Sequence, residues 1–409
     1  MHVLIPCLFQ LLVGVGALDS TTASSSNTCG NGSGRCACTD PSAPVNCCGS
    51  GHRCVGGGLG SCNCVSTSIS SEAWINPARR AGKKHGPQPL RGLALVHNAP
   101  SEVSLLTINA TTGKASVIGP AHSELFGLGD LVTVANDQFY YLGDTAAGAT
   151  LVALNLTTGA EICTQHVDVA TIKFVGIGQS LDHDAVTGSL VLSGVASNLS
   201  SGTHSVYRAP DVGCGSMTHV GHFGLANYLP SIHSSSFDAK GQRLFVTVAT
   251  NKSTTAIGIL DLTSGNMSVV PEGAAAPNLH DTITGMHWDV GTQMLLGVMP
   301  SSDDSTLQLH ALQVPSGANP TWFSKSLSGV PSKWDALGGN SGTASAFNSR
   351  SGLLYFTAGT TDPTSGEIAW ELASVNVDLG TVMAHPPLSF DGPISQCSDC
   401  LMALTARIF

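Results

Sequence analysis

The chain has 409 residues, of which only 11% are charged, and it carries 47 glycines and a formal net charge of −10 at pH 7. This length allows a large core, and the composition excludes an intrinsically disordered chain and favours a loop-rich β protein. From residue 92 onward, 10 Lys and Arg stand against 24 Asp and Glu, a net charge of −14. A surface of that sign repels nucleic acid and anionic lipid but tolerates neutral glycans, proteins and cations.

The N-terminal residues form one apolar stretch, MHVLIPCLFQLLVGVGA, that ends in small residues. It is about 15 apolar residues long, too short to cross a bilayer comfortably. Val15 and Ala17 occupy the −3 and −1 positions of a signal-peptide cleavage site. We therefore predict a signal peptide over 1–17 and a secreted protein. An N-terminal anchor is the alternative, because no Lys or Arg precedes the stretch.

Residues 29–64 hold eight of the 13 cysteines and almost no aliphatic side chains. A segment this poor in apolar residues needs covalent cross-links to fold, and disulfides form in an oxidising compartment. The spacing C-x6-C…CC-x5-C-x7-C resembles the inhibitor cystine-knot, or knottin, arrangement. A zinc module is the alternative, disfavoured by the adjacent cysteine pair. The predicted disulfide cysteines here are Cys29, Cys36, Cys38, Cys47, Cys48, Cys54, Cys62 and Cys64.

Residues 65–89 are rich in Ser and Pro and show no sustained periodicity, which is typical of a linker. They carry Arg79, Arg80, Lys83 and Lys84. Those residues also fit a dibasic processing site or a patch attracted to anionic surfaces, but a solvated linker is the favoured interpretation.

From residue 90 the sequence repeats an alternating apolar run that ends in a turn with glycine. Three examples are LLTINATTG (105–113), LVALNLTTG (151–159) and IGILDLTSG (257–265). The turn glycines recur at a period of roughly 50 residues, which marks a propeller or another repeat array. They are Gly113, Gly159, Gly213, Gly265, Gly317 and Gly380.

Each repeat reads as four strands, because period-2 alternation indicates half-buried strands. A single such sheet leaves both faces apolar, and radial stacking of the sheets buries them. We predict an all-β fold, a six-bladed propeller over 90–409. The first unit lacks an innermost strand, and LMALTARIF (401–409) is expected to supply it and close the ring. Seven blades are the alternative, because the gap between Gly317 and Gly380 is the longest.

The turn pattern over 90–409 resembles that of extracellular propellers with YVTN- or SMP30-like repeats. The resemblance lies in turn spacing alone and implies no catalytic residues.

Four cysteines fall in the repeats. Cys163 and Cys214 each follow the turn glycine of neighbouring units, which places them on adjacent blades at a separation that argues against a bridge. Cys397 and Cys400 are expected to form a local disulfide before the last strand. A redox role for this pair is the alternative.

No strong catalytic signature is present. Asp182 and Asp184 in DHDAVTG are faintly like a calcium loop, but the same position holds an ordinary turn in other repeats. The loops that enter the innermost strands are enriched in His and carboxylate side chains. They contain His122, Glu124, Gln179, Tyr228, His233, His280, Asp281, His287, Asp335 and Asn340. His219 and His222 follow an outer strand and are expected on the surface.

Two functions follow from these features. The first is a secreted interaction protein that binds an extracellular glycan or protein through a propeller face and the cysteine-rich module. The second is a metal-dependent hydrolase or lyase, with a divalent metal such as zinc or calcium at the channel mouth. Its predicted ligands are His233, His280, Asp281 and His122, because imidazoles and carboxylates from neighbouring blades can converge on one ion. One of these imidazoles could also act as a general base. Hydrogen bonding to loop backbones is the simpler role for all of them.

Overall fold

The computed structural model describes fifteen segments of the chain. They are residues 52–56, 62–66, 89–96, 99–123, 132–145, 148–166, 180–195, 203–225, 228–250, 255–270, 284–301, 306–314, 320–337, 345–391 and 401–405. The chain divides into two compact units, Met1–Ala73 and Trp74–Phe409.

In the first unit the structure describes one antiparallel pair, β1 (His52–Gly56) and β2 (Cys62–Ser66). Cys54 and Cys64 stand opposite each other in its register. Cys29, Cys36, Cys38, Cys47 and Cys48 lie outside the described residues. The knottin-like pairing therefore stays a prediction.

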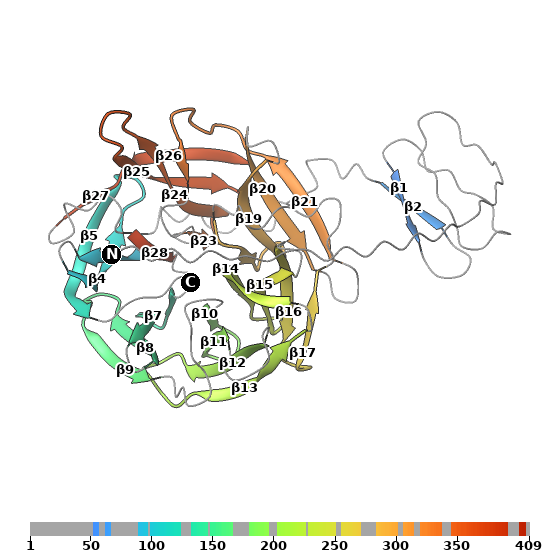
Figure 1. Cartoon of the computed structure of the whole chain (residues 1–409), viewed down its shortest axis with the longest axis horizontal. Coiled ribbons are helices and arrows are strands. Elements are labelled where there is room, and N and C mark those ends of the chain that lie inside the picture. Colours follow the sequence, from blue (N-terminus) through green and yellow to red (C-terminus); the bar gives the residue numbers. More distant parts are fainter. Residues whose placement is uncertain are drawn as a thin grey trace, which may run out of the picture. The chain divides into compact units, whose positions relative to one another are not determined.

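The second unit is all β and forms a ring of six sheets, as Figure 1 shows. Blade 1 contains β3 (Leu90–Val96), β4 (Ala99–Ile108), β5 (Lys114–Ser123), β27 (Ser389–Phe390) and β28 (Leu401–Thr405). Blade 2 contains β6 (Val132–Ala135), β7 (Gln138–Thr145), β8 (Gly148–Asn155) and β9 (Glu161–His166). Blade 3 contains β10 (Ser180–Asp184), β11 (Ser189–Val195), β12 (Thr203–Pro210) and β13 (Thr218–Gly224).

The other three blades follow in chain order. Blade 4 contains β14 (Tyr228–Asp238), β15 (Arg243–Thr250), β16 (Thr255–Asp261) and β17 (Asn266–Val269). Blade 5 contains β18 (His287–Asp289), β19 (Met294–Pro300), β20 (Leu307–Gln313) and β21 (Thr321–Ser326). Blade 6 contains β22 (Ala336–Leu337), β23 (Ala346–Asn348), β24 (Leu353–Thr361), β25 (Ile368–Asn376) and β26 (Thr381–Pro387). The sequence prediction of a six-bladed all-β propeller is confirmed.

The seven-blade alternative is wrong. The long interval after Gly317 is occupied by two nine-residue strands, β24 and β25, and by the segment that leads into them. All these strands belong to the one sheet of blade 6.

The core lies between the blades, in six apolar clusters that each join two neighbours. Strand β7 shows how the alternation produces this. Phe139 and Tyr141 pack toward blade 1, and Tyr140 and Leu142 pack toward blade 3. Successive side chains of a strand point to opposite faces of its sheet, so each inner strand contributes to two clusters.

The ring is closed by hydrogen bonding between distant parts of the chain. Strand β28 pairs antiparallel with β3 and forms the innermost strand of blade 1, while β27 pairs with β5 on the outside. Figure 1 shows β28 beside the first blade, near the ring axis. Leu404 on β28 is buried in the cluster that joins blades 6 and 1.

Seven turns share one construction that explains the repeated glycine. The Oδ1 of an Asn or Asp accepts hydrogen bonds from the N–H groups two and three residues later. A glycine four residues after this Asn or Asp donates its N–H to the backbone carbonyl of the Asn or Asp. The glycines have φ between 63° and 74°, which L residues adopt only with strain. The capping residues are Asn109, Asn155, Asp184, Asp261, Asn348, Asp362 and Asn376.

One cysteine prediction is wrong. Cys163 on β9 and Cys214 form a disulfide that joins blades 2 and 3, with their Cα atoms 5.7 Å apart. The turn that begins at Asp211 leans onto the neighbouring blade and brings Cys214 within reach of β9. Cys397 and Cys400 lie outside the described residues, so their disulfide remains a prediction.

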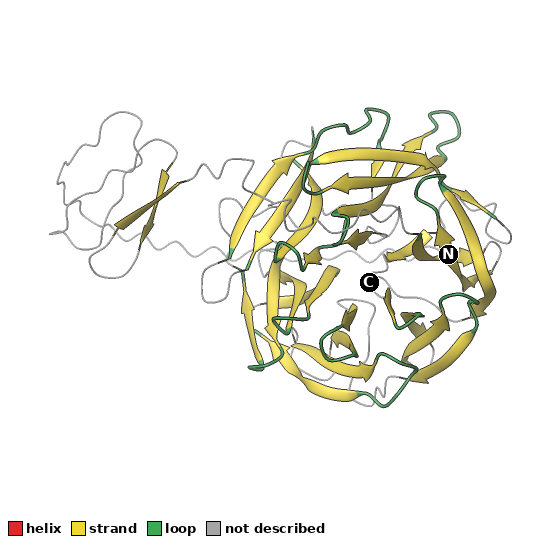
Figure 2. Ribbon diagram, turned by 180° about the vertical axis from the view of Figure 1, so that it is seen from behind, coloured by secondary structure: helices red, strands yellow, loops and turns green. Residues whose placement is uncertain are grey.

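Strands and connecting turns account for all the described elements, as Figure 2 shows. In this part of the chain no helix is long and apolar enough to cross a membrane.

Candidate functional site

The antiparallel sheets give the ring two different faces. The turns that join first to second and third to fourth strands lie on one face, which we call the turn face. The segments that join second to third strands, and one blade to the next, lie on the other, which we call the loop face. The predicted channel-mouth residues were assigned to segments of the loop face.

Of the four predicted metal ligands, only His122 has a described side chain. It lies on β5 toward the outside of blade 1 rather than in a loop that enters an inner strand, and its Nε2 is 2.9 Å from the carbonyl oxygen of Gly159. His233 lies on β14, and His280 and Asp281 lie outside the described residues. Among the described residues, no group of three His, Cys, Asp or Glu side chains could hold a metal. The four-residue site therefore remains a prediction.

His287 is held inside the ring at the junction of blades 5 and 6. Its Nε2 is 2.8 Å from Ser345 Oγ, which also accepts the N–H of Gly285 at 3.0 Å. Burial lowers the pKa of His287 to about 4, so the ring is neutral at pH 7. The hydroxyl of Ser345 therefore hydrogen-bonds to both Gly285 and His287, which indicates a structural role for His287.

On the loop face of blade 6, the buried carboxylate of Glu371 is paired with Lys333 and accepts the indole N–H of Trp334 at 3.1 Å. Asp335 Oδ1 accepts the N–H of Thr361 at 2.8 Å. These contacts fasten the segment before β22 to the blade. The remaining predicted residues of this face are Tyr228, which begins β14, and Glu124, Gln179 and Asn340, which lie outside the described residues.

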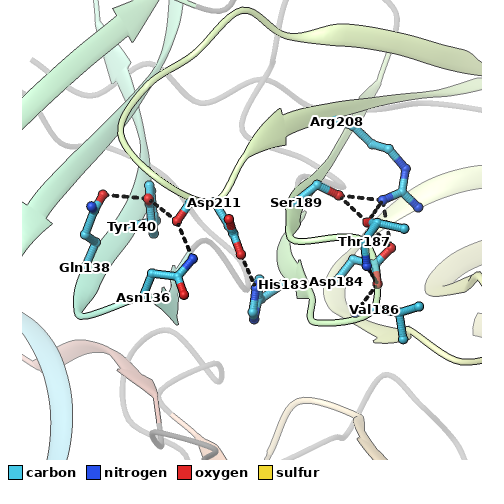
Figure 3. Close-up of polar contacts among 10 residues, drawn as sticks. All are labelled: Asn136, Gln138, Tyr140, His183, Asp184, Val186, Thr187, Ser189, Arg208 and Asp211. Atoms are coloured by element: carbon cyan, nitrogen blue, oxygen red, sulfur yellow. Dashed lines mark hydrogen bonds and ion pairs between the residues drawn. The ribbon is translucent and has the colours of Figure 1, made fainter.

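At blades 2 and 3 the turn face carries a dense polar network (Figure 3). The carbonyl oxygen of Asp211 accepts the Asn136 amide at 3.1 Å and lies 2.8 Å from Tyr140 Oη. Its carboxylate is 2.9 Å from Nε2 of His183. The turn of blade 3 that starts at Asp211 is therefore fixed by side chains of two blades.

Gln138 completes this network. Its Oε1 accepts the N–H of Gly213 at 2.9 Å and lies 2.6 Å from Tyr140 Oη. Burial, together with the negative charge of Asp211, raises the pKa of Tyr140 to about 12, so its hydroxyl keeps the proton that it shares between two acceptors. The disulfide at Cys214 follows directly.

A second network ties blade 3 to blade 4 on the same face. Arg208 Nη1 donates to Asp184 Oδ2 at 2.7 Å and Nη2 donates to Gln242 Oε1 at 2.5 Å, while Gln242 Nε2 donates back to Asp184 at 2.9 Å. Burial by itself would raise the pKa of Asp184, but hydrogen bonds from Thr187, Gln242, Arg208 and the Val186 N–H lower it below its usual value. Both oxygens of this fully buried carboxylate are occupied, so Asp184 acts as a turn cap rather than a calcium ligand.

Apolar side chains are exposed at the tips of these fixed turns. Among the described residues, six large apolar side chains are exposed, and four of them lie in turns of the turn face: Val186, Val212, Val290 and Leu379. Val186 is 67% exposed and Val212 is 61% exposed. Both belong to blade 3, in two turns that the contact between His183 and Asp211 connects. We call Val186 and Val212 the blade 3 patch; Val290 lies in blade 5 and Leu379 in blade 6.

Sequence reasoning did not identify this patch. The sequence places Val186 and Val212 in turns, but which turns become neighbours is set by the sheet order. The sequence contained one signal: Cys163 and Cys214 lie after the turn glycines of neighbouring repeats, and Cys214 comes two residues after Val212.

Comparisons with known proteins give only distant structural likenesses, and no protein-family model and no curated protein matches the chain. TolB from Acinetobacter baumannii is 10% identical, with 78% of this chain and 67% of that chain covered and a TM-score of 0.48. Periplasmic gluconolactonase PpgL of Pseudomonas aeruginosa is 10% identical, with 74% and 96% covered and a TM-score of 0.44. BP39L lectin from Burkholderia pseudomallei is 13% identical, with 74% and 87% covered and a TM-score of 0.42. Likenesses this distant carry no argument about activity or ligand.

Proposed function

We propose that the protein is a secreted binding protein whose propeller presents the blade 3 patch to an extracellular protein or glycan. The carrying observation is that Val186 and Val212 are exposed on turns whose backbones are fixed by side-chain hydrogen bonds and a disulfide. The turn that carries Val186 needs only the Asp184 cap and Gly188, so its construction does not require an apolar residue at the tip.

A fixed surface favours binding for an energetic reason. Ordering a mobile loop costs free energy on association, and a turn that is already ordered avoids that cost. Apolar tips beside a hydrogen-bonding pair such as His183 and Asp211 form the mixture found in protein interfaces, an apolar centre with a polar surround. A protein ligand therefore fits best, and a neutral glycan remains open.

Export is supported by the disulfide between Cys163 and Cys214, because such bridges persist in oxidising compartments and are rare in the cytosol. With the predicted cleavage after Ala17, the N-terminal residue of the secreted protein is Leu18. In this proposal the cysteine-rich residues 29–64 act as a second recognition module.

The test compares three full-length proteins on an array of extracellular proteins and on a glycan array. The proteins are wild type, Val186→Ser/Val212→Ser, and Met383→Ser as a matched control, since Met383 is also exposed but lies on β26 of blade 6. We expect a ligand that binds wild type and control and loses about tenfold or more in affinity to the double variant, as contact residues at the centre of an interface do. Equal binding by all three proteins, or no ligand on either array, would contradict the proposal.

A further inference from the structure

His219 and His222 form a pair on the outermost strand of blade 3, away from the blade 3 patch. Both are exposed on β13, and their ring centroids are 4.4 Å apart. In a regular strand, residues three apart point to opposite faces of the sheet. Such a spacing would normally separate the two imidazoles.

A β-bulge places them on the same face. His222 stands opposite Ser205 and His219 stands opposite Tyr207, with the register shift between Val206 and Tyr207. Ser205 and Tyr207 are two apart on β12 and so point to one face. The extra residue of the bulge, Val220, absorbs the difference and turns an i, i+3 pair into neighbours.

Each ring has a partner that fixes its orientation. Nδ1 of His222 is 2.8 Å from Oγ of the buried Ser205. The ring of His219 lies 5.0 Å from that of Tyr207. Partial burial, reinforced by the neighbouring His222, lowers the pKa of His219, and a hydrogen bond to the Gly221 backbone opposes that shift. Metal-bound imidazoles in proteins usually show this arrangement, one nitrogen tied to a second group and the other free for the ion.

From this geometry we infer that His219 and His222 form a two-imidazole site for a divalent transition metal, Cu²⁺ above all. With metal–nitrogen bonds of about 2.1 Å, two imidazoles at a right angle have ring centroids about 4.5 Å apart, and at the tetrahedral angle about 5.2 Å. At the observed 4.4 Å both rings can reach one ion, and this spacing is close to that of two imidazoles at the right angle found in square-planar Cu²⁺ sites. Cu²⁺ also has the highest affinity for nitrogen ligands among the divalent first-row metals. In the bound form Nδ1–H of His222 donates to Ser205, and Nε2 binds the ion.

Blade 2 supplies a matched control. His166 on β9 is exposed and its Nδ1 is 3.1 Å from Thr150 Oγ1, so it repeats the arrangement of His222 and Ser205. The position that corresponds to His219 is held by Thr164, which stands opposite Val152. Within the described part of the chain, His166 therefore has the hydroxyl partner but no second imidazole.

The test titrates the full-length protein with CuCl₂ by calorimetry and records the electron paramagnetic resonance spectrum at low copper occupancy. We expect one site with two coupled nitrogens. His219→Gln or His222→Gln should remove one equivalent of bound copper, and Ser205→Ala should weaken binding about tenfold, as loss of a group that orients a metal ligand does. His166→Gln should leave the site unchanged.

Both glutamine variants are surface changes, and their thermal unfolding without copper shows that each is folded. The inference is overturned if the two variants bind as many equivalents as wild type with the same affinity, or if His166→Gln lowers binding as much as they do.

Discussion

At the scale of single residues, two glycines of the repeated turn have similar φ angles but different surroundings, so the energetic need for glycine can be compared between them. Gly159 has φ 67° and a side chain there would collide with the backbone carbonyl of Ile118 in blade 1. Gly265 has φ 73° and nothing lies within 4 Å of the position that a Cβ would occupy.

Comparing alanine variants of these two glycines separates the cost of a positive φ from the cost of a steric collision. Gly265→Ala should lower the free energy of unfolding by about 1–2 kcal/mol, the cost of a left-handed L residue. Gly159→Ala should cost about 3 kcal/mol or more, because a backbone collision is added to that strain. Urea denaturation of both variants checks this, and equal losses would show that the contact between blades 1 and 2 relaxes.

Buried histidines at this scale make the protein sensitive to acid. Among the described side chains, His204 and His310 are buried imidazoles without a hydrogen-bond partner on either nitrogen, and burial lowers the pKa of each to about 4. His287 has the same low pKa of about 4. The unfolded chain takes up these protons near pH 6.5, whereas the folded protein resists uptake until about pH 4.

The protein therefore has its full stability above about pH 6.5 and loses stability as the pH falls toward 4. At pH 5 each of these imidazoles lowers the free energy of unfolding by roughly 2 kcal/mol. His204→Leu should reduce this loss by one imidazole's share, measured as the difference in unfolding free energy between pH 8 and pH 5. A variant whose difference equals that of wild type would show that His204 is protonated in the folded protein.

At the scale of elements, the junction of blades 2 and 3 combines a disulfide with hydrogen bonds from several side chains. The disulfide closes a loop of 51 residues in sequence separation and anchors the turn from Asp211 to Gly213, whose backbone is also held by Gln138 and Asn136. The apolar cluster between these blades is already formed by side chains such as Tyr140 and Leu190. The extra restraints act on the turn rather than on the core.

Removing the bridge with Cys163→Ser/Cys214→Ser should lower the free energy of unfolding by about 2–4 kcal/mol, since the cross-link restricts the unfolded chain. The fold should persist, but amide exchange should rise locally in residues 211–214. Unchanged exchange there would mean that the hydrogen bonds alone fix the turn and that the patch does not need the bridge.

At the scale of the whole molecule, the ring depends on strands that are far apart in sequence. Blade 1 takes its innermost strand from β28, and Leu404 packs with Leu106 of blade 1 and Tyr355 of blade 6. This interface is the only one of the six that joins the two ends of the repeat array.

Leu404→Ala should cost about 2–4 kcal/mol, as truncation of a buried leucine does, and should broaden the urea transition if the ring opens before the blades unfold. Thr405→Ala, one residue later and only partly buried, is the control and should change stability by less than about 0.5 kcal/mol. A small effect of Leu404→Ala would show that the pairing of β28 with β3 does not take part in the cooperative unfolding of the ring.

The strands, the glycine turns and a ring of six blades could be predicted from the sequence, with seven blades as the alternative. These are local properties: alternating apolar residues select strands, and an Asx residue with a glycine four positions later selects the turn, as at Asn109 and Gly113. The expected closing strand, 401–409, also followed from simple complementarity, because the first unit lacked one strand.

Which side chains from different blades come into contact could be learned only from the folded structure. Cys163 and Cys214 were expected to stay apart, yet they bond because a turn of one blade leans on the next. The bulge at Val220 that brings His219 beside His222 depends on strand register. The contact between His183 and Asp211, which connects the turns of Val186 and Val212, depends on sheet order. Periodicity fixes which face of a sheet a residue occupies, but it does not fix where a bulge interrupts the ladder or which turns become neighbours. These contacts could therefore not be predicted from the sequence.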